Sequence, residues 1–529
     1  MAVLASKGTA SVTLAIGETL NVLAGGQGVA VLKGGASKGQ SVELGASVRK
    51  IGPFPFAMPI TINSQSGAIT YYVGADSAAP HVEIAGEYDA ASGQTVLDDA
   101  SRAAVNLSAP PNAFGFSMIG DSRTADLLTG NGTNSRNWFN WACAYYNQTP
   151  QLVGTYGVSG KRTDEYLTNG NFEIALADGA KWLIFGLPCY NDINQSNAGY
   201  TDTYGHTITT SNVAAYALDN IIVYAKRAVA AGKSVILLTE PGGSALATAA
   251  QAAAVYEFNR LIKERVKEVQ GAILYDPCQL IWNPTASTTT IAFKTNYTSD
   301  GVHNQQQAAR AVGKDFATNV LPAILPKIDT APANLSDSVA NSTNQLYRNP
   351  LFNTLTGGTN GGNFTLTSGN IPANMTISGT AAGLLSLVIT SATNSNGYGN
   401  DVTFAFTSTG VVSGRIDLDL TNSDWNLTDY LEGRIEIDVA AGGTGGINGV
   451  YAEMMITTNL GTLDYWANQA SAAGPMSTAG DTGLVLRTRR GLPYIGSSSK
   501  TSAKLRVWVA FGAAGTQTIT LRRPGVYRY

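Results

Sequence analysis

The pattern of hydrophobic and polar positions changes twice along the chain and divides it into three regions. From residue 1 to about 85, short apolar stretches alternate with turns rich in Gly, Ser and Lys, which predicts a small all-β module. From about 113 to 325, continuous apolar runs alternate with helical periodicity, which is typical of an α/β domain. Beyond about 349, short apolar stretches between turn residues return, so a second all-β region is expected.

In the central region, the apolar runs predict five parallel strands. Each run is short and continuous, as in strands covered by helices on both faces. Helical periodicity is clearest at 213–231, 246–269 and 305–320, and the last helix should end near Pro322. The predicted fold is a flavodoxin-like, doubly wound five-stranded parallel sheet with its site at the carboxyl ends of the strands. The predicted strands are 114–119, 152–156, 182–185, 235–238 and 272–275.

The flanking segments set the predicted domain boundaries. Residues 1–85 form the N-terminal module, for attachment or oligomerisation, and 86–112 form a connector. Pro, Asp, Asn and Ser dominate residues 326–348, which predicts a linker after the α/β domain at 113–325. About eight strands are expected over 349–529, which favours a β-sandwich of jelly-roll type.

Composition excludes several classes of protein. The 529 residues include 44% hydrophobic but only 13% charged side chains, which favours well-packed, β-rich domains over disorder. A net charge of −3 provides no basic footprint for nucleic acid. No apolar run reaches membrane-spanning length, and residues 1–20 lack the basic start of a signal peptide. We therefore expect a soluble chain that, if exported, does not use an ordinary cleaved signal.

The cysteines carry no recognisable chemistry. Cys143, Cys189 and Cys278 lie far apart, with neither CxxC nor Cys/His spacing. This pattern argues against both a disulfide framework and a zinc site. Because their neighbours are apolar, we expect three buried free thiols and no metal.

The first candidate for chemistry is a serine at the end of the first predicted α/β strand. The strand stops at Gly120-Asp121-Ser122, and a helical pattern follows. A serine placed there lies at the carboxyl end of a sheet, beside backbone N–H groups at a helix start. It can act as a nucleophile if the chain supplies a base and a group that orients the base. Gly-Asp-Ser is also an ordinary turn, so its partners decide the interpretation.

The candidate base is one of three histidines, His81, His206 and His303. Asp300 precedes His303 by three residues across a glycine, so the two side chains can meet within one turn. Asp300 would fix the imidazole tautomer and leave the other ring nitrogen facing Ser122. His206 is expected in a surface loop without a carboxylate to orient it, and His81 at the edge of the first β module.

Loops after the next two predicted strands offer donors for an oxyanion. Gly160 can present its backbone N–H at close approach because it has no side chain, and Gly157 is the alternative. Asn191 can present a side-chain N–H. With the N–H of Ser122, these groups would form a three-donor oxyanion hole.

These residues, Gly120-Asp121-Ser122, Gly160, Asn191 and Asp300-Gly-Val-His303, resemble the four sequence blocks of the SGNH (GDSL-type) hydrolase family over about 113–325. The resemblance implies Ser122 as nucleophile, His303 as base and Asp300 as its orienter. It also implies Ser122, Gly160 and Asn191 as the oxyanion hole, without a metal or cofactor. The family's third block is usually Gly-x-Asn-Asp. Four residues separate Gly186 from Asn191 in this chain, so a bulged loop is expected.

The surroundings of the motifs suggest a carbohydrate substrate. The loops carry polar and aromatic side chains, which suit a sugar bearing a small acyl group better than a long acyl chain. Tyr190 and Asp192 are candidate substrate contacts. The C-terminal sandwich resembles carbohydrate-binding modules, and Trp425 and Trp466 are candidates for stacking on sugars, with core packing as the alternative. The predicted activity is removal of O-acetyl groups from a bacterial surface polysaccharide.

The order of the domains suggests a setting for this activity. A β module, an esterase and a terminal sandwich resemble the layout of bacteriophage tail (tailspike) proteins that de-acylate surface polysaccharides. That resemblance implies a location in the virion tail or outside the cell, and a homotrimer formed through the β flanks. The alternatives are a secreted bacterial esterase acting on carbohydrates or lipids, and a receptor-binding or structural tail protein with a vestigial esterase. Neither nucleic acid nor membrane is expected as a partner.

Overall fold

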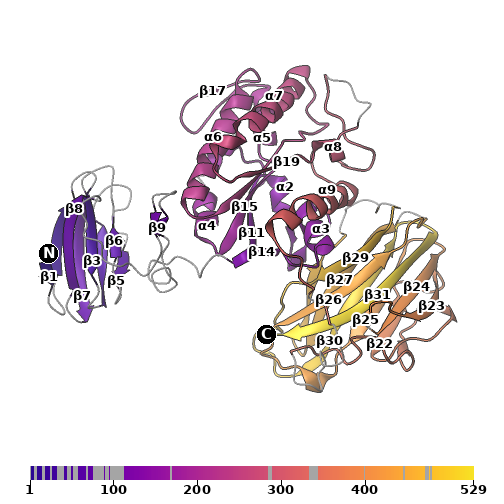
Figure 1. Cartoon of the computed structure of the whole chain (residues 1–529). Helices are drawn as coiled ribbons and strands as arrows, with labels where there is room; N and C mark the ends of the chain where they lie inside the picture. The colour runs from indigo at the N-terminus through magenta and orange to yellow at the C-terminus, as the bar shows by residue number, and fades with distance from the viewer. Residues whose placement is uncertain are drawn as a thin grey trace. The chain divides into compact units, whose positions relative to one another are not determined.

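The computed structural model of the chain (Figure 1) comprises two compact units, residues 1–115, 176–181 and 227–233 in one, and 116–175, 182–226 and 234–529 in the other. Before residue 112, the structure describes the backbone of short strands. The predicted connector lies mostly outside the described residues, as does His81. From residue 112 onward, the structure describes all residues except 167–169, 284–288, 330, 333–343, 398, 445–446, 471–475 and 477–478.

The central sheet has five strands in the order β14-β11-β15-β18-β19. Its neighbours β15–β18 and β18–β19 pair in parallel, with Leu183 opposite Val235 and Leu237 opposite Leu274. The first strand lies inside the sheet and the second at its edge, which is the flavodoxin-like order, so the predicted α/β class is confirmed. The strands are β11 (Asn112–Gly120), β14 (Gln151–Gly157), β15 (Ala180–Gly186), β18 (Ser234–Leu238) and β19 (Ile273–Tyr275).

Helices cover both faces of the sheet, with α6 and α7 on one side and α3 and α9 on the other (Figure 1). The helix predicted at 246–269 begins at Ala249 because Thr248 caps it. The Thr248 hydroxyl accepts the N–H of Gln251, whose side chain accepts the N–H of Thr248. The main helices are α3 (Trp138–Tyr145), α5 (Tyr190–Ser196), α6 (Val213–Ala230), α7 (Ala249–Arg265) and α9 (Gln306–Asn319).

Short elements fill the connections of the α/β domain. As predicted, the last long helix ends before Pro322, which lies near the start of a separate turn of helix. The short helices are α2 (Ser122–Ala125), α4 (Asn171–Ala177), α8 (Cys278–Ile281) and α10 (Leu321–Ile324), with 3-10 turns at Thr163–Glu165 and Val266–Glu268. The short strands are β12 (Leu128–Thr129), β13 (Gly132–Thr133), β16 (Tyr200–Thr201) and β17 (Thr207–Ile208).

The C-terminal region is a β-sandwich, as predicted. Every second residue of its central strands is buried, for example Phe404 and Phe406 in one sheet and Ile416 and Leu418 in the other. This alternation turns one face of each sheet toward a shared core and the other face outward. The sheets have six strands each, in the orders β20-β22-β25-β30-β27-β28 and β21-β23-β24-β31-β26-β29.

Among the described residues, more strands form in the sandwich than the eight expected, three of the additional ones at sheet edges and one inside a sheet. The first half comprises β20 (Thr359–Asn360), β21 (Thr365–Ser368), β22 (Met375–Gly379), β23 (Leu385–Thr393), β24 (Asn400–Ser408) and β25 (Val412–Asp419). After a 3-10 turn at Asn422–Asp424, the second half comprises β26 (Leu431–Val439), β27 (Ile447–Thr458), β28 (Gly461–Ala467), β29 (Asp481–Arg487), β30 (Lys500–Phe511) and β31 (Gly515–Arg528).

The N-terminal region is all β, as predicted. Its strand backbones form two four-stranded sheets, in the orders β1-β8-β3-β6 and β2-β7-β4-β5, with antiparallel pairing. The strands are β1 (Ala2–Leu4), β2 (Thr9–Leu14), β3 (Glu18–Leu23), β4 (Gln27–Leu32), β5 (Ser41–Leu44), β6 (Arg49–Ile51), β7 (Met58–Ser66) and β8 (Ile69–Ala75), followed by the short pair β9 (Tyr88–Asp89) and β10 (Gln94–Thr95).

Direct contacts join the sandwich to the α/β domain within the larger unit. The Asp481 carboxylate at the start of β29 receives the Tyr145 hydroxyl from α3 and the Arg310 guanidinium from α9. Gln148 donates to the carbonyl of Val485 at 2.7 Å. The three cysteines are buried and free, as predicted. Among the described helices, none is long and apolar enough to cross a membrane.

Candidate active site

Ser122 lies at a sharp turn from strand into helix. Strand β11 ends at Gly120, and Asp121 caps the short helix α2 by accepting the N–H of Arg123 at 2.9 Å. A Cβ atom on Gly120 would lie 2.3 Å from the Thr124 hydroxyl and 2.6 Å from the carbonyl oxygen of Gly186. Only glycine fits there, and the close packing delivers the half-buried Ser122 to the carboxyl end of the sheet.

Ser122, His303 and Asp300 form a continuous hydrogen-bonded line. The Nε2 atom of His303 lies 2.8 Å from Ser122 Oγ, and its Nδ1 atom lies 2.6 Å from Asp300 Oδ2. Asp300 Oδ1 accepts the backbone N–H groups of Val302 and His303 at 2.9 and 2.8 Å. Gly301 makes this tight turn possible with a φ of +81°. The structure thus brings together three residues that the sequence separates by up to 181 positions.

Hydrogen bonding keeps the Asp300 carboxylate ionised. Partial burial by itself would raise the pKa of Asp300, but the His303 ring and the backbone N–H groups of His303 and Val302 hold it well below its ordinary value. The side chains of His303 and Asp300 are 26% and 47% exposed, so solvent and a substrate can reach the ring. An ionised Asp300 fixes the Nδ1–H tautomer of His303 and leaves Nε2 free to accept the Ser122 proton.

The two candidate glycines of the second loop have different environments. A Cβ on Gly157 would lie 2.4 Å from the backbone nitrogen of Ala125 and 2.7 Å from the carbonyl oxygen of Asp121, so Gly157 packs against the Ser122 turn. Gly160 is exposed, has a φ of +78° and has open space around its Cα. Gly160 therefore has the accessible backbone, whereas Gly157 lets the second strand approach the turn.

Asn191 sits in the first turn of α5 and is half-buried. Its Nδ2 donates to the carbonyl oxygen of Lys161 at 3.0 Å, which ties it to the residue after Gly160. A carboxamide carries two N–H groups, so one remains after this bond. In the loop before Asn191, where a bulge is expected, Leu187 adopts a left-handed φ of +52°.

The sequence motifs did not predict the buried ionic cluster that lies beneath Ser122. Arg123 pairs with Asp121 at 2.8 Å and with Glu240 at 2.7 Å, and it donates to the carbonyl oxygen of Leu187 at 2.6 Å. Burial acts to lower the pKa of Arg123, but the two carboxylates raise it well above its ordinary value. The cluster ties the residue after Ser122 to the ends of β15 and β18. The sequence contained one signal of this cluster, because Glu240 closely follows the fourth predicted strand, 235–238.

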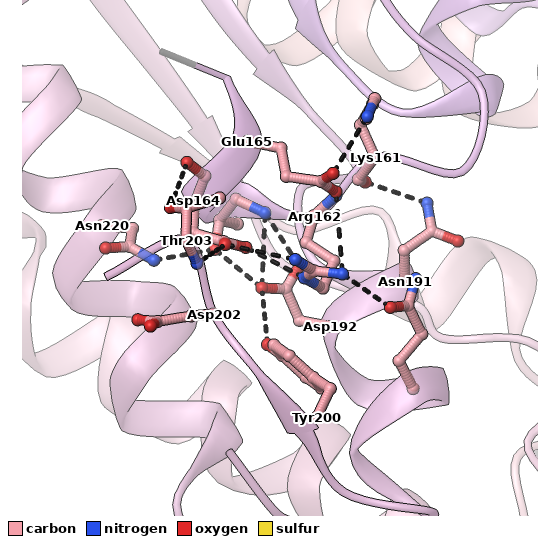
Figure 2. Close-up of polar contacts among 12 residues, drawn as sticks. Lys161, Arg162, Asp164, Glu165, Asn191, Asp192, Tyr200, Asp202, Thr203 and Asn220 are labelled. Atoms are coloured by element: carbon pink, nitrogen blue, oxygen red, sulfur yellow. Dashed lines mark hydrogen bonds and ion pairs between the residues drawn. The ribbon is translucent and has the colours of Figure 1, made fainter. Parts of the chain in front are cut away.

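A second polar network holds the loop that carries Gly160 (Figure 2). Asp192 accepts the backbone N–H of Thr163 at 3.1 Å and its hydroxyl at 2.7 Å. Arg162 pairs with Asp164 at 3.0 Å, and Asp164 accepts the N–H of Thr203 at 2.9 Å. Burial raises the pKa of Asp192 to about 7, although the Thr163 hydrogen bonds oppose the shift.

Three of the four predicted sugar contacts are corrected by their burial. Asp192 is 0% exposed, and Thr163 occupies its carboxylate, so it positions the loop and cannot meet a sugar. Tyr190 is 6% exposed, with the Arg123 guanidinium 5.2 Å from its ring centroid. Trp425 is 0% exposed, so core packing, the alternative, applies to it. Trp466 is half-buried on β28 and stays a candidate.

His206 has the carboxylate partner that the sequence analysis did not assign to it. Its Nδ1 lies 2.8 Å from Asp202 Oδ2, and Asp202 also accepts the hydroxyl of Tyr216 at 2.6 Å. The surface location is as predicted, because the His206 side chain is 68% exposed. Within the described residues, no group of three or more His, Cys, Asp or Glu side chains could hold a metal ion.

Comparisons with known proteins found solved structures that resemble parts of this chain at low sequence identity. No family model and no curated protein matches the chain. A carbohydrate esterase family 2 enzyme with a carbohydrate-binding domain from Corynascus thermopiles is 15% identical, covering 61% of this chain and 95% of its own, with a TM-score of 0.27. A GDSL-like lipase from Bacteroides thetaiotaomicron VPI-5482 is 16% identical, covering 43% and 98%, with a TM-score of 0.29. A family two carbohydrate esterase from Clostridium thermocellum, in complex with cellohexaose, is 10% identical, covering 60% and 93%, with a TM-score of 0.25.

These likenesses are too low in TM-score to carry an argument about activity. The resemblance to bacteriophage tail proteins finds no support in them and stays a prediction. The function is therefore inferred from the geometry around Ser122.

Proposed function

We propose that this protein hydrolyses carboxylic esters with Ser122 as nucleophile, in the manner of SGNH-type hydrolases, and that its substrate is an acylated carbohydrate. The observation that supports the activity is the hydrogen-bonded line from Asp300 through His303 to Ser122. A serine hydroxyl becomes a competent nucleophile when a base lies within hydrogen-bonding distance and a third group orients that base.

In the first step, Ser122 Oγ attacks the ester carbonyl carbon while its proton moves to His303 Nε2. The imidazolium that forms keeps its Nδ1–H on Asp300, whose charge stabilises it. The tetrahedral intermediate then collapses. His303 returns the proton to the departing alcohol oxygen of the sugar, and the acyl group remains on Ser122.

The developing oxyanion would be held by the backbone N–H groups of Ser122 and Gly160 and by the remaining N–H of Asn191. The Asn191–Lys161 bond supports this assignment because it ties Asn191 to the residue that follows Gly160. In the second step, a water molecule loses its proton to His303 and attacks the acyl carbon. The acid leaves, and Ser122 regains its proton.

A small acyl group, most simply acetyl, suits the polar loops beside Ser122. Arg162 and Glu165 belong to the loop that carries Gly160, and Asn191 follows on α5 (Figure 2). Such side chains favour a hydroxylated ring over a long hydrocarbon chain. A sandwich in contact with the same α/β domain favours a polymer, so we propose an acetylated polysaccharide of a bacterial surface.

Covalent labelling tests the nucleophile directly. A fluorophosphonate probe should label wild type on Ser122, as shown by peptide mass spectrometry, and should leave Ser122→Ala unlabelled. Turnover of p-nitrophenyl acetate should disappear in the same variant. Equal residual rates in wild type and Ser122→Ala would rule out the proposed mechanism.

The acyl and polymer specificity needs its own measurement. Wild type should hydrolyse p-nitrophenyl acetate faster than the palmitate ester, and it should release acetate from at least one polymer in a panel of acetylated bacterial surface polysaccharides. A preference for palmitate would favour a lipase, the alternative activity. Ester turnover without acetate release from any polymer would remove the polysaccharide from the proposal.

A further inference from the structure

The outward face of one sandwich sheet carries large aromatic side chains. Across the adjacent strands β25, β30 and β27, Arg415 lies opposite Trp508, and Trp508 lies opposite Tyr451. Their chain neighbours Ile416 and Val507 are 0% exposed and belong to the core. Because side chains alternate along a strand, Arg415, Trp508 and Tyr451 all point to the outer face of the sheet.

Three rings on this face form what we call the aromatic platform: Tyr451, Trp466 and Trp508. The rings of Tyr451 and Trp508 are nearly parallel, at 13°, with centroids 5.9 Å apart. The Trp466 ring lies 5.8 Å from the first and 6.4 Å from the second. All three are half-buried and so retain some exposed surface. Aromatic surface of this kind provides apolar area against which the C–H face of a sugar ring can pack.

Arg415 lies over this platform. Its guanidinium carbon is 5.0 Å from the Trp508 ring centroid, and its buried Nε has no hydrogen-bond partner in the part of the chain that the structure describes. Among the described residues, no carboxylate lies within ion-pair distance of Arg415. Burial lowers the pKa of Arg415, and the charge of Arg506 acts in the same direction. A planar cation next to an aromatic surface is thus left available.

The two carboxylates whose charges act on Arg415, Asp417 and Glu453, already have partners. Asp417 receives Arg506 at 2.5 Å and Lys504 at 2.9 Å. Glu453 accepts the indole N–H of Trp508 at 2.8 Å, which also fixes the orientation of that ring. Burial raises the pKa of Glu453, and the neighbouring Asp464 acts in the same direction. The orientation of the Trp508 ring is therefore set before any ligand binds.

We propose that Arg415 and the aromatic platform bind an acidic polysaccharide, with a sugar ring packed against Trp508 and Tyr451 and a hexuronate carboxylate paired with Arg415. The forked guanidinium donors match the two oxygens of a carboxylate. This proposal deepens the proposed function by making the substrate polymer an acidic one. The statement that the bound polymer is the substrate rests on that function, whereas the binding itself does not.

The platform also contacts the part of the α/β domain that follows Ser122. A Cβ on Gly132, in the hairpin after α2, would lie 2.3 Å from Trp466 Cβ. Thr133 in the same hairpin accepts the N–H of Asn468 at 2.9 Å. Strand β28 therefore contributes Trp466 to the platform and packs against the hairpin that leads away from the Ser122 turn.

The test measures binding without turnover, in full-length Ser122→Ala by calorimetry. The acidic ligands are oligogalacturonate, alginate and hyaluronan oligosaccharides, and the neutral ligands are cellohexaose and maltohexaose. We expect one acidic ligand to bind at least about tenfold more tightly than either neutral one, the factor that one charge-assisted contact supplies. Its affinity should fall as salt is raised, because salt screens the attraction.

Variants assign the binding to the platform. Arg415→Gln should reduce the acidic ligand's affinity to the level of the neutral ligands, and Arg415→Lys should recover part of it. Trp508→Ala should weaken all saccharide binding. The matched control, Arg260→Gln, removes an exposed arginine of α7 and should change nothing. Unfolding midpoints measured alongside identify any variant that fails to fold.

Two outcomes would overturn the proposal: no binding of any acidic ligand, or unchanged affinity in folded Arg415→Gln. Turnover of p-nitrophenyl acetate by wild type is measured separately. Binding in the absence of turnover would remove the proposed esterase and leave the saccharide site standing. Turnover without binding would do the reverse.

Discussion

Two loops of the α/β domain build nearly the same Asp–His pair, and in one of them the histidine also contacts a serine hydroxyl, that of Ser122. Asp300 lies 2.6 Å from Nδ1 of His303, and Asp202 lies 2.8 Å from Nδ1 of His206. Each aspartate also accepts the backbone N–H of its own histidine. The local geometry of such a pair is therefore easily formed by a short turn, and it does not by itself indicate catalysis.

The two pairs differ in what surrounds them. His303 is 26% exposed, and its Nε2 reaches Ser122, whereas His206 is 68% exposed. Asp202 is buried and shared with the hydroxyl of Tyr216, so it fastens the loop to α6. An Asp–His pair becomes a candidate base only where a folded sheet delivers a hydroxyl to the free ring nitrogen.

The largest expected effect separates the two histidines. His303→Ala should lower kcat on p-nitrophenyl acetate by about 10⁴-fold or more, because Ser122 loses its base. His206→Ala should keep the rate within about twofold, since its side chain is mostly exposed and its partner holds a loop. Comparable losses in the two variants would remove the distinction between the pairs.

The next effect concerns the buried ionic cluster of Arg123, Asp121 and Glu240 beneath Ser122, which is separate from both Asp–His pairs. Glu240→Gln should destabilise the fold by roughly 3 kcal/mol, because it leaves the buried Arg123 with one carboxylate instead of two. Urea unfolding measures the change. Glu257→Gln, on the exposed surface of α7, is the matched control and should leave the midpoint in place. A Glu240→Gln midpoint equal to the control's would show that the cluster contributes nothing to stability.

The third effect tests whether Asn191 acts as an oxyanion donor beside the hydrogen-bonded residues Asp300, His303 and Ser122. Asn191→Ala should lower kcat roughly 100- to 1,000-fold with little change in KM, because the lost N–H would bind the transition state and not the ground state. Asn194→Ala, on an exposed position of the same helix, should retain full activity. An unchanged kcat in Asn191→Ala would assign the oxyanion role to other groups.

The smallest effect is a pH dependence that separates Asp192 from Asp300. Burial raises the pKa of Asp192 to about 7. Between the pKa of the unfolded state and pH 7, the Asp192 carboxyl therefore holds a proton in the folded state that it has lost in the unfolded state. Stability from this group is therefore present at low pH and is lost as the pH rises, by about 2 kcal/mol between pH 5 and pH 7. Asp300 has the opposite sign, because its pKa is lowered and its contribution is lost on acidification.

The measurement is the difference in unfolding free energy between wild type and Asp192→Asn at pH 5 and pH 7. Asparagine does not titrate, so wild type should lose stability relative to the variant as the pH rises. A difference that stays constant over this range would mean that Asp192 remains ionised in the folded state.

Much of the fold followed from local pattern. The five strands of the α/β sheet coincide with apolar runs. Inner strands such as β15 and β18 need a continuous run because they are buried on both faces, whereas β14 at the edge is partly exposed. The sandwich followed from alternation, because one face of each sheet must be buried. The edge strands β20 and β21 were not anticipated, since their sequences carry little apolar signal and their pairing depends on neighbours far along the chain.

The candidate site divides in the same way. Its motif residues could be predicted from the sequence, because tight turns require particular residues at fixed spacing. Examples are Gly120, Gly301 and the short spacing of Asp300 and His303. The burial of Asp192 and Trp425 could not, because burial depends on what the rest of the chain packs against each residue. The pairing of Asp202 with His206 is local and was not assigned from the sequence.

By itself, the sequence determined the local chemistry: a serine at a strand end, an aspartate and a histidine within one turn, and apolar patterns that place each on a sheet or loop. The tertiary structure decided which groups meet. Among the described residues, it pairs Arg123 with two carboxylates and Arg415 with none, a difference that no local pattern contains. The physical reason is that hydrogen bonds and ion pairs act over a few ångströms, whereas these partners lie up to 181 residues apart along the chain.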